Sequence, residues 1–233
     1  MTDYTLYYWP IAFRGQFVRS VLAHVGATWD ETDFNAIRAL KSKSPAEQPV
    51  PHMGPPVLTD HAAALSFSQM PAILHYLGKK HGLMEDDPAS EAMTVKIVAD
   101  ANDVLYEITL YNGAQMWTGE SWRDFVPRLE RWMAMFEETG RRHGMTAEAG
   151  YLLGTDKPGI ADLATCSLWG TMTEKLPSLR PLLEKAAPAI AGLCDRIAAL
   201  PEQAELRARS DAEYGELYCA GQIEASLRKV LSA

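Results

Sequence analysis

The chain has 233 residues, 47% hydrophobic and 22% charged, which is typical of a folded protein of one or two domains and excludes collagen-like, coiled-coil and disordered classes. Its 22 Lys and Arg residues stand against 30 Asp and Glu, and the net charge of −8 disfavours nucleic acid or an anionic membrane as a partner. No apolar run approaches the roughly 20 residues of a membrane span, and the first residues lack a signal-peptide pattern, so we expect a cytoplasmic protein.

The first third of the chain alternates strand and helix signals. Residues 5–9 are β-branched and aromatic, apolar residues at helical spacing run from Phe17 to Val25, and residues 28–34 are a second strand candidate. This order predicts a β-α-β unit with parallel strands. A short hairpin at 57–65 and a helix through 70–77 follow. The four prolines and absent periodicity of residues 35–55 predict a long loop.

Residues 83–89 are acidic, contain Pro88 and are the candidate linker between two domains, 1–82 and 90–233. Helical periodicity dominates the second domain. A capping-box-like start at Ser121 places Pro127 too deep for a first turn, which predicts a kink or a later start. The other helices are expected at about 93–111, 160–176, 188–200 and 223–230, by the same periodicity.

The cysteines and histidines give little sign of a cross-linked or metal-binding protein. Cys166, Cys194 and Cys219 are odd in number and lie in apolar surroundings, which favours free thiols in a reducing compartment. The six histidines are scattered along the chain, so the sequence predicts no metal site.

Three segments in order carry a resemblance to one family. They are Tyr8-Trp9-Pro10 with Arg14-Gly15 and Arg19, Gly54-Pro55-Pro56-Val57-Leu58 with Gln69 to Leu77, and Tyr151-Leu152-Leu153-Gly154 with Gly159-Ile160-Ala161-Asp162. The chain resembles the cytosolic glutathione transferases, in particular a bacterial-style member of the tyrosine-type (alpha-, mu-, pi- or sigma-like) classes. The resemblance implies an α/β thioredoxin-like domain that binds glutathione, followed by an all-α domain that holds a hydrophobic substrate.

The chemistry of such an enzyme requires a thiolate, because an unperturbed thiol with a pKa of about 8.5 is only slightly ionised at neutral pH. The family takes the activating group from the end of the first strand as Tyr, Ser or Cys. Residues 1–19 contain no Ser and no Cys, which leaves tyrosine. Tyr7 and Tyr8 point to opposite faces of a strand. The resemblance assigns catalysis to Tyr8, with Arg14 near the sulfur, and leaves Tyr7 as a core residue.

The resemblance also implies a set of glutathione contacts, with two departures. Pro55, before a proline that we expect to be cis, lacks the N–H that would pair with the ligand's backbone. Met70 replaces the family's serine at the γ-glutamyl carboxylate. The remaining candidate contacts are Gln69 at the start of the helix, Ser68 as its possible cap, Lys43 or Lys41 for the glycyl carboxylate, and Asp103 reaching a partner subunit's glutathione.

The second substrate would be a hydrophobic electrophile in a pocket between the domains. Its candidate lining residues are Phe13, Tyr111, Trp117 and Tyr214, with Met116, Met172 and Tyr218 beside them. The predicted protein is a homodimeric transferase with glutathione as co-substrate and no metal. Two alternatives stay open. Pro55 and Met70 favour a catalytically silent binding or regulatory module, and a glutathione-dependent reductase or isomerase would use the same thiolate.

Overall fold

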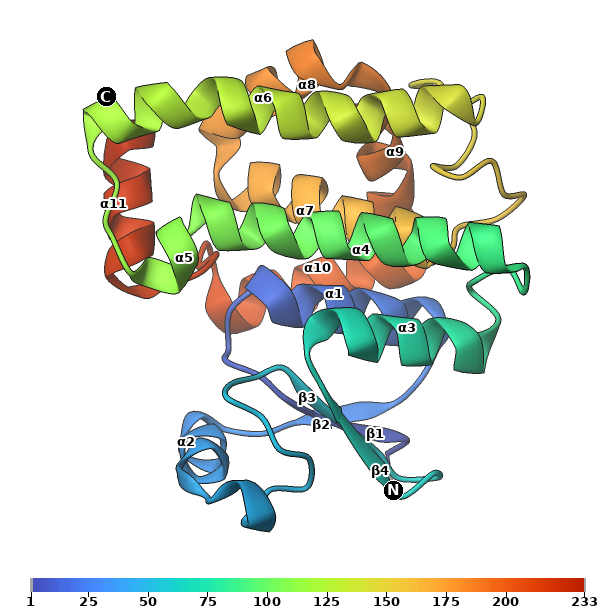
Figure 1. The fold of residues 1–233 in the computed structure, drawn as a ribbon, viewed down its shortest axis with the longest axis vertical. Coiled ribbons are helices and arrows are strands. Elements are labelled where there is room, and N and C mark those ends of the chain that lie inside the picture. The colour runs from blue at the N-terminus through green and yellow to red at the C-terminus, as the bar shows by residue number, and fades with distance from the viewer. Residues whose placement is uncertain (1, 233) are drawn as a thin grey trace.

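The computed structural model describes residues 2–232, and its N-terminal part is built on a four-stranded mixed sheet (Figure 1). The strand order is β2-β1-β3-β4. Strand β1 (Tyr4–Tyr7) pairs in parallel with β2 (Trp29–Glu31) and antiparallel with β3 (Val57–Asp60), which pairs antiparallel with β4 (Leu65–Ser68). The parallel β1 and β2 confirm the predicted β-α-β unit.

Two helices join this sheet to the rest of the molecule. Helices α1 (Phe13–His24) and α3 (Met70–His81) cover one face of the sheet and lie between it and the helical domain (Figure 1). Helix α1 is buried along most of its length because it packs on α3 on one side and on the helical domain on the other. The residues at the start of α1 therefore lie where the two domains meet.

The second part of the chain is entirely helical in the described residues. Helix α7 (Ile160–Lys175) is buried almost throughout and packs on the long helix α4 (Pro88–Ile108). The other long helix, α6 (Gly119–Arg142), meets α7 where the Phe136 and Trp169 rings pack edge to face at 5.6 Å. The shorter helices are α5 (Leu110–Gly113), α8 (Arg180–Ala186), α9 (Pro188–Ala198), α10 (Pro201–Tyr214) and α11 (Gly221–Leu231), and a 3₁₀ turn spans Pro177–Leu179.

The start of α7 shows how one buried carboxylate organises a helix end. Asp162 accepts hydrogen bonds from the backbone N–H of Gly159 at 2.9 Å and from that of Leu152 at 2.7 Å. Burial raises the pKa of Asp162, and these bonds oppose that shift. The carboxylate therefore caps α7 and ties the preceding loop to it.

Three details differ from the sequence prediction. Residues 35–55 are not all loop, because α2 (Phe34–Ser42) begins at the cap Asp33 and a 3₁₀ turn spans Pro45–Glu47. Helix α6 begins at Gly119 with Thr118 as its cap, so Ser121 is not the cap and a later start is wrong; Pro127 lies within the helix. Helices α8 and α10 have no counterpart in the prediction.

Candidate active site

Tyr8 follows the last residue of β1 and points into the region where the domains meet. Its side chain is only 4% exposed, and its hydroxyl oxygen accepts a hydrogen bond from the backbone N–H of Arg14 at 3.0 Å. The ring also lies against Gly15, where a Cβ would come within 2.2 Å of the Tyr8 ring. Because Gly15 has no side chain, the Tyr8 ring can lie directly against the backbone of α1.

The hydroxyl of Tyr8 keeps its own proton available. Burial raises the pKa of Tyr8 to about 12, although the positive charges of Arg14 and Arg19 oppose this shift. The group is therefore a neutral phenol at physiological pH. Within residues 2–232 no acceptor takes its proton, since its one hydrogen bond is received from Arg14. Tyr8 is a hydrogen-bond donor without a protein acceptor, beside two cations.

Arg14 contributes charge as well as its backbone N–H. Its side chain is half-buried, and its Nε donates to Oδ1 of Asn102 in α4 at 3.2 Å. Burial lowers the pKa of Arg14 and the nearby Tyr8 raises it. The guanidinium carbon lies 4.8 Å from the centroid of the Phe13 ring. Arg14 thus places a cation near Tyr8 and links the two domains.

The C-terminal part of the chain forms a wall beside these residues. The Phe13 backbone N–H donates to the Tyr218 carbonyl at 3.1 Å, and the two rings meet edge to face at 5.4 Å. The Tyr218 hydroxyl is buried and has no hydrogen-bond partner within the described residues. The buried carboxylate of Glu224 holds this wall, because it accepts from the backbone N–H groups of Tyr218 at 3.0 Å, Cys219 at 2.9 Å and Ala220.

The segments predicted to hold glutathione meet at the start of β3 and the start of α3. The Pro55–Pro56 peptide bond is cis, as expected, and Pro55 is half-buried. Ser68 ends β4 and is half-buried, and Gln69 is exposed with a φ of +70°, which is rare for a residue with a side chain. The Met70 side chain is 1% exposed and belongs to the core. The side chain of Gln69 does not cap α3.

The remaining polar candidates lie on the surface. Lys43 is exposed and follows the last residue of α2, whereas the Nζ of Lys41 lies 5.7 Å from the centroid of the Trp9 ring. The Trp9 ring in turn packs on Phe34 at 5.0 Å, so α2 brings Lys41 to the residue that follows Tyr8. Asp103 is exposed on α4. Lys41 therefore lies beside the residue next to Tyr8, although the two are 33 positions apart in the sequence.

The four apolar candidates separate in the structure. Phe13 lies beside Arg14, and the Tyr214 ring is buried against the guanidinium of Arg19 at 5.0 Å. Tyr111 is 52% exposed, and its ring meets that of Tyr106 edge to face at 5.2 Å. Trp117 is a core residue of the helical domain, where its indole N–H donates to the Ile108 carbonyl at 2.9 Å and its ring packs on Trp122 and Phe125.

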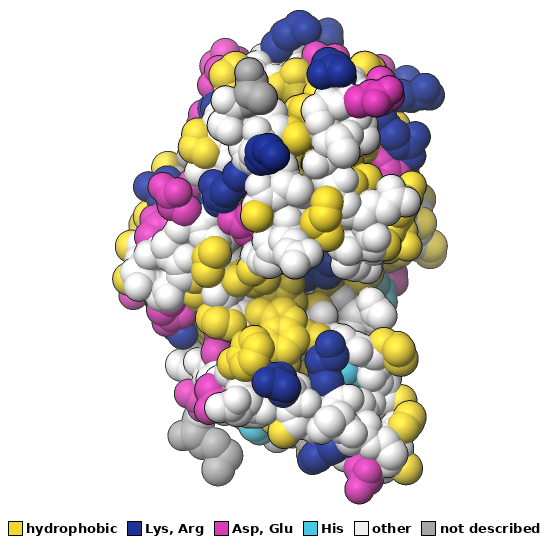
Figure 2. Space-filling view, turned by 90° about the vertical axis from the view of Figure 1, so that its left-hand side faces the viewer, with side chains coloured by type: hydrophobic (Ala, Val, Ile, Leu, Met, Phe, Trp, Pro, Cys, Tyr) yellow, Lys and Arg dark blue, Asp and Glu magenta, His cyan; other side chains and the backbone are white. Residues whose placement is uncertain are grey.

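The surface where the domains meet has a mixed apolar and basic character. In Figure 2, hydrophobic side chains gather between the smaller and the larger part of the molecule, and basic side chains lie beside them. A surface of this kind suits a ligand that carries both carboxylates and an apolar group. Within residues 2–232, no cluster of three or more potential ligands could hold a metal ion, and no helix is long and apolar enough to cross a membrane.

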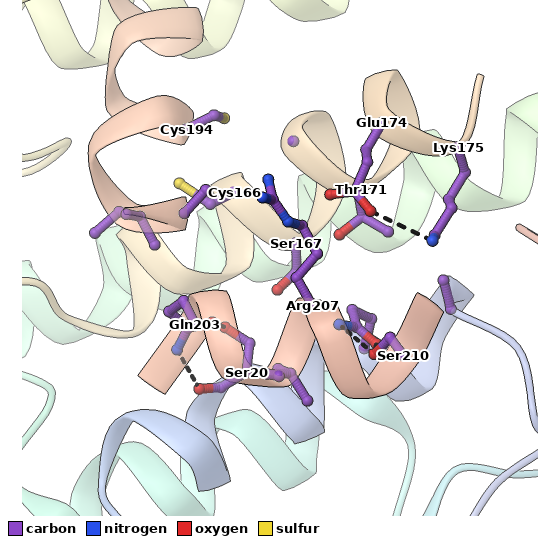
Figure 3. Close-up of a pocket in the computed structure, with 16 residues that line it drawn as sticks. Ser20, Cys166, Ser167, Thr171, Glu174, Lys175, Cys194, Gln203, Arg207 and Ser210 are labelled. Atoms are coloured by element: carbon purple, nitrogen blue, oxygen red, sulfur yellow. Dashed lines mark hydrogen bonds and ion pairs between the residues drawn. The ribbon is translucent and has the colours of Figure 1, made fainter. Parts of the chain in front are cut away.

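A separate small cavity of about 70 Å³ lies behind the active site, between α1, α7, α9 and α10 (Figure 3). The thiols of Cys166 and Cys194 line it, and both cysteines are free and buried. Two polar pairs cross it from α1 to α10: Ser20 donates to Gln203 at 2.9 Å, and Gln16 to Ser210 at 3.3 Å. These two pairs tie α1 to α10 across the interface between the domains.

The sequence comparison decides the family. The family model of the glutathione S-transferase C-terminal domain matches residues 93–230, which is more than half of the chain. The chain belongs to the glutathione S-transferase family. No curated protein matches the sequence significantly. The two-domain fold expected from the three motifs is thereby confirmed, with a small mixed sheet followed by the helical domain of a glutathione S-transferase.

Solved structures share this glutathione S-transferase fold at low identity. The pi-class glutathione S-transferase of Onchocerca volvulus is 20% identical over 94% of this chain and 98% of that chain, with a TM-score of 0.73. Prostaglandin synthase D of Nilaparvata lugens is 21% identical over 89% and 98%, with a TM-score of 0.67. The protein NaGST-2 is 21% identical over 89% and 97%, with a TM-score of 0.70.

Sequence reasoning missed several residues around the tyrosine of this family member. Asn102 receives the Arg14 side chain, Glu31 pairs with Arg19, and Cys219 lies in the wall formed by the C-terminal segment. Asn102 and Glu31 are 88 and 12 residues away in sequence from the side chains they bind. A single polar residue in a periodic helix carries no signal of its partner, so only the folded chain identifies these contacts.

Proposed function

We propose that this chain is a tyrosine-type glutathione transferase that conjugates the glutathione thiolate to a hydrophobic electrophile. The observation that carries the proposal is the buried Tyr8 hydroxyl, which accepts from the backbone of Arg14 and has no acceptor for its own proton among the described residues. A thiolate bound next to this hydroxyl would accept that hydrogen bond. A bond to a charged group is worth about 1.5 to 3 kcal/mol, and lowering a thiol pKa by two requires about 2.7 kcal/mol.

In the proposed complex, glutathione lies along the edge formed by residues 55–57 and the start of α3. The first N–H groups of α3 and the half-buried Ser68 would bind the γ-glutamyl carboxylate, since helix N-termini favour anions. Gln69 is exposed at that same point. Lys41 or Lys43 would neutralise the glycyl carboxylate. Because Met70 faces the core, its side chain supplies no polar contact to the ligand.

The electrophile would bind beside the sulfur, against the apolar surface of Phe13 and the wall at Tyr218. These rings pack edge to face next to Arg14, whose charge would steady the thiolate as it attacks. Tyr214 is buried against Arg19 and Tyr111 lies against Tyr106, so the proposed electrophile surface consists of Phe13 and Tyr218. An aromatic or extended apolar electrophile is the class of substrate that such a surface favours.

The proposed assembly is a cytoplasmic homodimer. Ile97 and Val104 of α4 are buried within the chain itself, so they do not supply the interface. Exposed apolar side chains on α4 and α6 do support one, namely Val95, Tyr106 and Met135. Sedimentation at micromolar concentration should give twice the mass of one chain, and a monomer would contradict the dimer. In the dimer, Asp103 would reach the partner's glutathione.

The test of the function combines binding and turnover. We expect retention of the protein on immobilised glutathione, release by free glutathione, and turnover of a generic aryl halide with a rate that rises with thiolate formation. The chain would instead be a silent glutathione-binding module if it were retained without turnover of any electrophile, disulfide or isomerisable substrate. Failure to bind glutathione by calorimetry would contradict the proposal altogether.

A further inference from the structure

Arg19 is a fully buried cation on the face of α1 that carries the active site. Its side chain is 0% exposed, and it forms a two-pronged ion pair with Glu31 of β2, with Nε 2.9 Å from Oε1 and Nη2 2.6 Å from Oε2. A buried ion pair rarely stabilises a fold more than apolar side chains of the same size would. The presence of this pair here therefore calls for an explanation other than stability.

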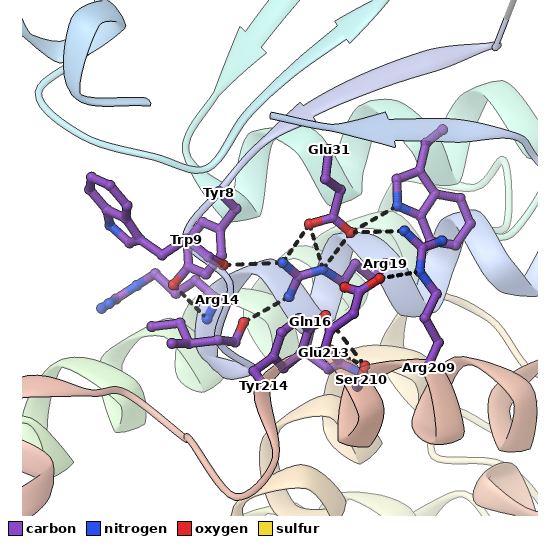
Figure 4. A network of polar contacts seen from close by, with 12 residues as sticks. Tyr8, Trp9, Arg14, Gln16, Arg19, Glu31, Arg209, Ser210, Glu213 and Tyr214 are labelled. Atoms are coloured by element: carbon purple, nitrogen blue, oxygen red, sulfur yellow. Dashed lines mark hydrogen bonds and ion pairs between the residues drawn. The ribbon is translucent and has the colours of Figure 1, made fainter. Parts of the chain in front are cut away.

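The donors of Arg19 also hold the segment that follows Tyr8. Nη1 donates to the Ile11 carbonyl at 2.8 Å and Nη2 to the Trp9 carbonyl at 3.2 Å. This segment connects Tyr8 at one end with Arg14 at the other. One guanidinium thus fixes two carbonyls of the loop that sets the distance between the hydroxyl and the cation of the site (Figure 4).

The ring of Tyr8 itself lies against the same face of α1. Gly15 and Arg19 are four residues apart in this helix, so they share a face. The Tyr8 ring touches the bare backbone of Gly15, and its centroid lies 5.7 Å from the guanidinium carbon of Arg19. The orientation of the Tyr8 hydroxyl therefore depends on where Arg19 is held.

The helical domain contributes to holding the pair. Trp29 donates its indole N–H to Glu31 at 3.0 Å, and Arg209 of α10 approaches Glu31 to 4.0 Å while its guanidinium lies over the Trp29 ring at 5.1 Å. The groups that face Arg19 are thus Glu31, Tyr8, Tyr214 and, across Glu31, Arg209 (Figure 4).

We propose that Arg19, clamped by Glu31, is the positioning residue of the active site, because it fixes residues 9–11 so that the Tyr8 hydroxyl aims its proton at the bound sulfur. This inference rests on the proposed function of Tyr8. Arg19 touches neither sulfur nor electrophile in this scheme. It acts through the backbone of the loop and through the Tyr8 ring, with α10 steadying its carboxylate partner.

The decisive variant is Arg19→Lys, which keeps the positive charge beside Glu31 but loses the planar fork that reaches both carbonyls. We expect kcat at neutral pH to fall about tenfold, because small displacements of a catalytic group are costly. Thiolate absorbance against pH should show a higher pKa for the bound thiol. The KM for glutathione should stay within about threefold of the wild-type value.

The matched control is Arg128→Lys. Arg128 pairs with Glu107 through Nε at 2.7 Å, and the indole of Trp132 donates to the same carboxylate at 2.9 Å, so this surface triad repeats the chemistry of Arg19, Glu31 and Trp29 away from Tyr8. Arg128→Lys should leave kcat and the thiol titration unchanged. An equal shift in both lysine variants would overturn the proposal, as would an unchanged titration in a folded Arg19→Lys.

Should Arg19→Lys fail to fold, the charge-neutral double variant Arg19→Met with Glu31→Met removes both ions and leaves neither unpaired. We expect it to fold and to show the raised thiol titration. A folded double variant with wild-type kcat and titration would overturn the positioning role. Tyr8→Phe in the same assay separates the two hypotheses. If Tyr8→Phe raises the pKa of the bound thiol and the Arg19 variants do not, only the positioning proposal fails. If Tyr8→Phe leaves that pKa unchanged, the proposed function fails.

Discussion

The two sides of the proposed glutathione site differ in how the chain holds them. On the tyrosine side, Tyr8 is buried, bonded to the Arg14 backbone and surrounded by two cations. On the side formed by Pro55 and α3, one backbone donor is missing and Met70 is buried in the core. The fold thus holds the Tyr8 hydroxyl, which would activate the sulfur, in a fixed position. On the other side, Pro55 and Met70 offer glutathione fewer polar contacts than the family pattern implies. Chemistry and affinity are therefore separable in this molecule, and mutations on each side should affect one more than the other.

The largest expected effect is that of Tyr8→Phe on turnover. Removing a donor worth about 1.5 to 3 kcal/mol should lower kcat at neutral pH by roughly tenfold to hundredfold and raise the thiol pKa by about one to two. Activity should partly recover at alkaline pH, while glutathione affinity changes little. Tyr7→Phe is the control, because Tyr7 points to the other face of the strand. Thiolate absorbance against pH measures the thiol pKa in both variants. A raised pKa in Tyr7→Phe but not in Tyr8→Phe would show that Tyr8 is the wrong assignment.

The burial of Tyr8 should also affect how the free energy of unfolding depends on pH in alkaline solution. The pKa of Tyr8 in the folded chain is about 12, above the value of about 10 in an unfolded chain, so the folded state binds the proton more tightly. The stabilisation is fully present below pH 10 and is lost as the pH rises through about 12, with a total of about 2.7 kcal/mol. Urea unfolding between pH 9 and pH 12 should therefore show a shallower decline in Tyr8→Phe than in the wild type. Equal slopes would contradict the burial argument.

Gly15→Ala tests the close approach behind the tyrosine. The new Cβ would lie 2.2 Å from the Tyr8 ring, so the ring must move or the helix must shift. Overpacking of this kind costs about 1 to 3 kcal/mol of stability and should lower kcat as the hydroxyl is displaced. Gly170→Ala is the control, because Gly170 is also a helical glycine and its Cβ would meet nothing nearer than 3.5 Å. Thermal melts and kcat together separate the two, and a fully active Gly15→Ala would show that the contact is unimportant.

The smallest effect is expected on the affinity side, from Pro55→Val. A valine restores a backbone N–H that can pair with the ligand, worth about 0.5 to 1.5 kcal/mol, so glutathione should bind a few-fold to tenfold more tightly. The kcat at saturating glutathione should change little, in contrast to Tyr8→Phe. Calorimetric titration measures the affinity. Weaker binding in a folded variant would count against the strand-like pose of the ligand.

The sequence predicted the parts of this molecule that local patterns encode. The β-α-β unit follows from periodicity, and the cis Pro55–Pro56 bond follows from a motif. Helix α2 escaped prediction because it buries only Ile37 and Leu40, which is too few for a clear period. The role of Trp117 in the core and the Arg19–Glu31 pair depend on segments that meet only after folding. Elements and turns encoded by neighbouring residues could thus be predicted from the sequence, whereas contacts between distant segments could not.

The wall at residues 218–220 has a consequence for the order in which the protein can become active. Phe13 and Tyr218 are joined in the folded chain, and Glu224 fixes the backbone of the wall from within α11. A ribosome makes the chain from the N-terminus, so the strand that carries Tyr8 exists long before residue 224 emerges. The tyrosine side of the site therefore stays open on one flank until residue 224 has been made, and a nascent chain holding the whole sheet would still lack the proposed electrophile surface.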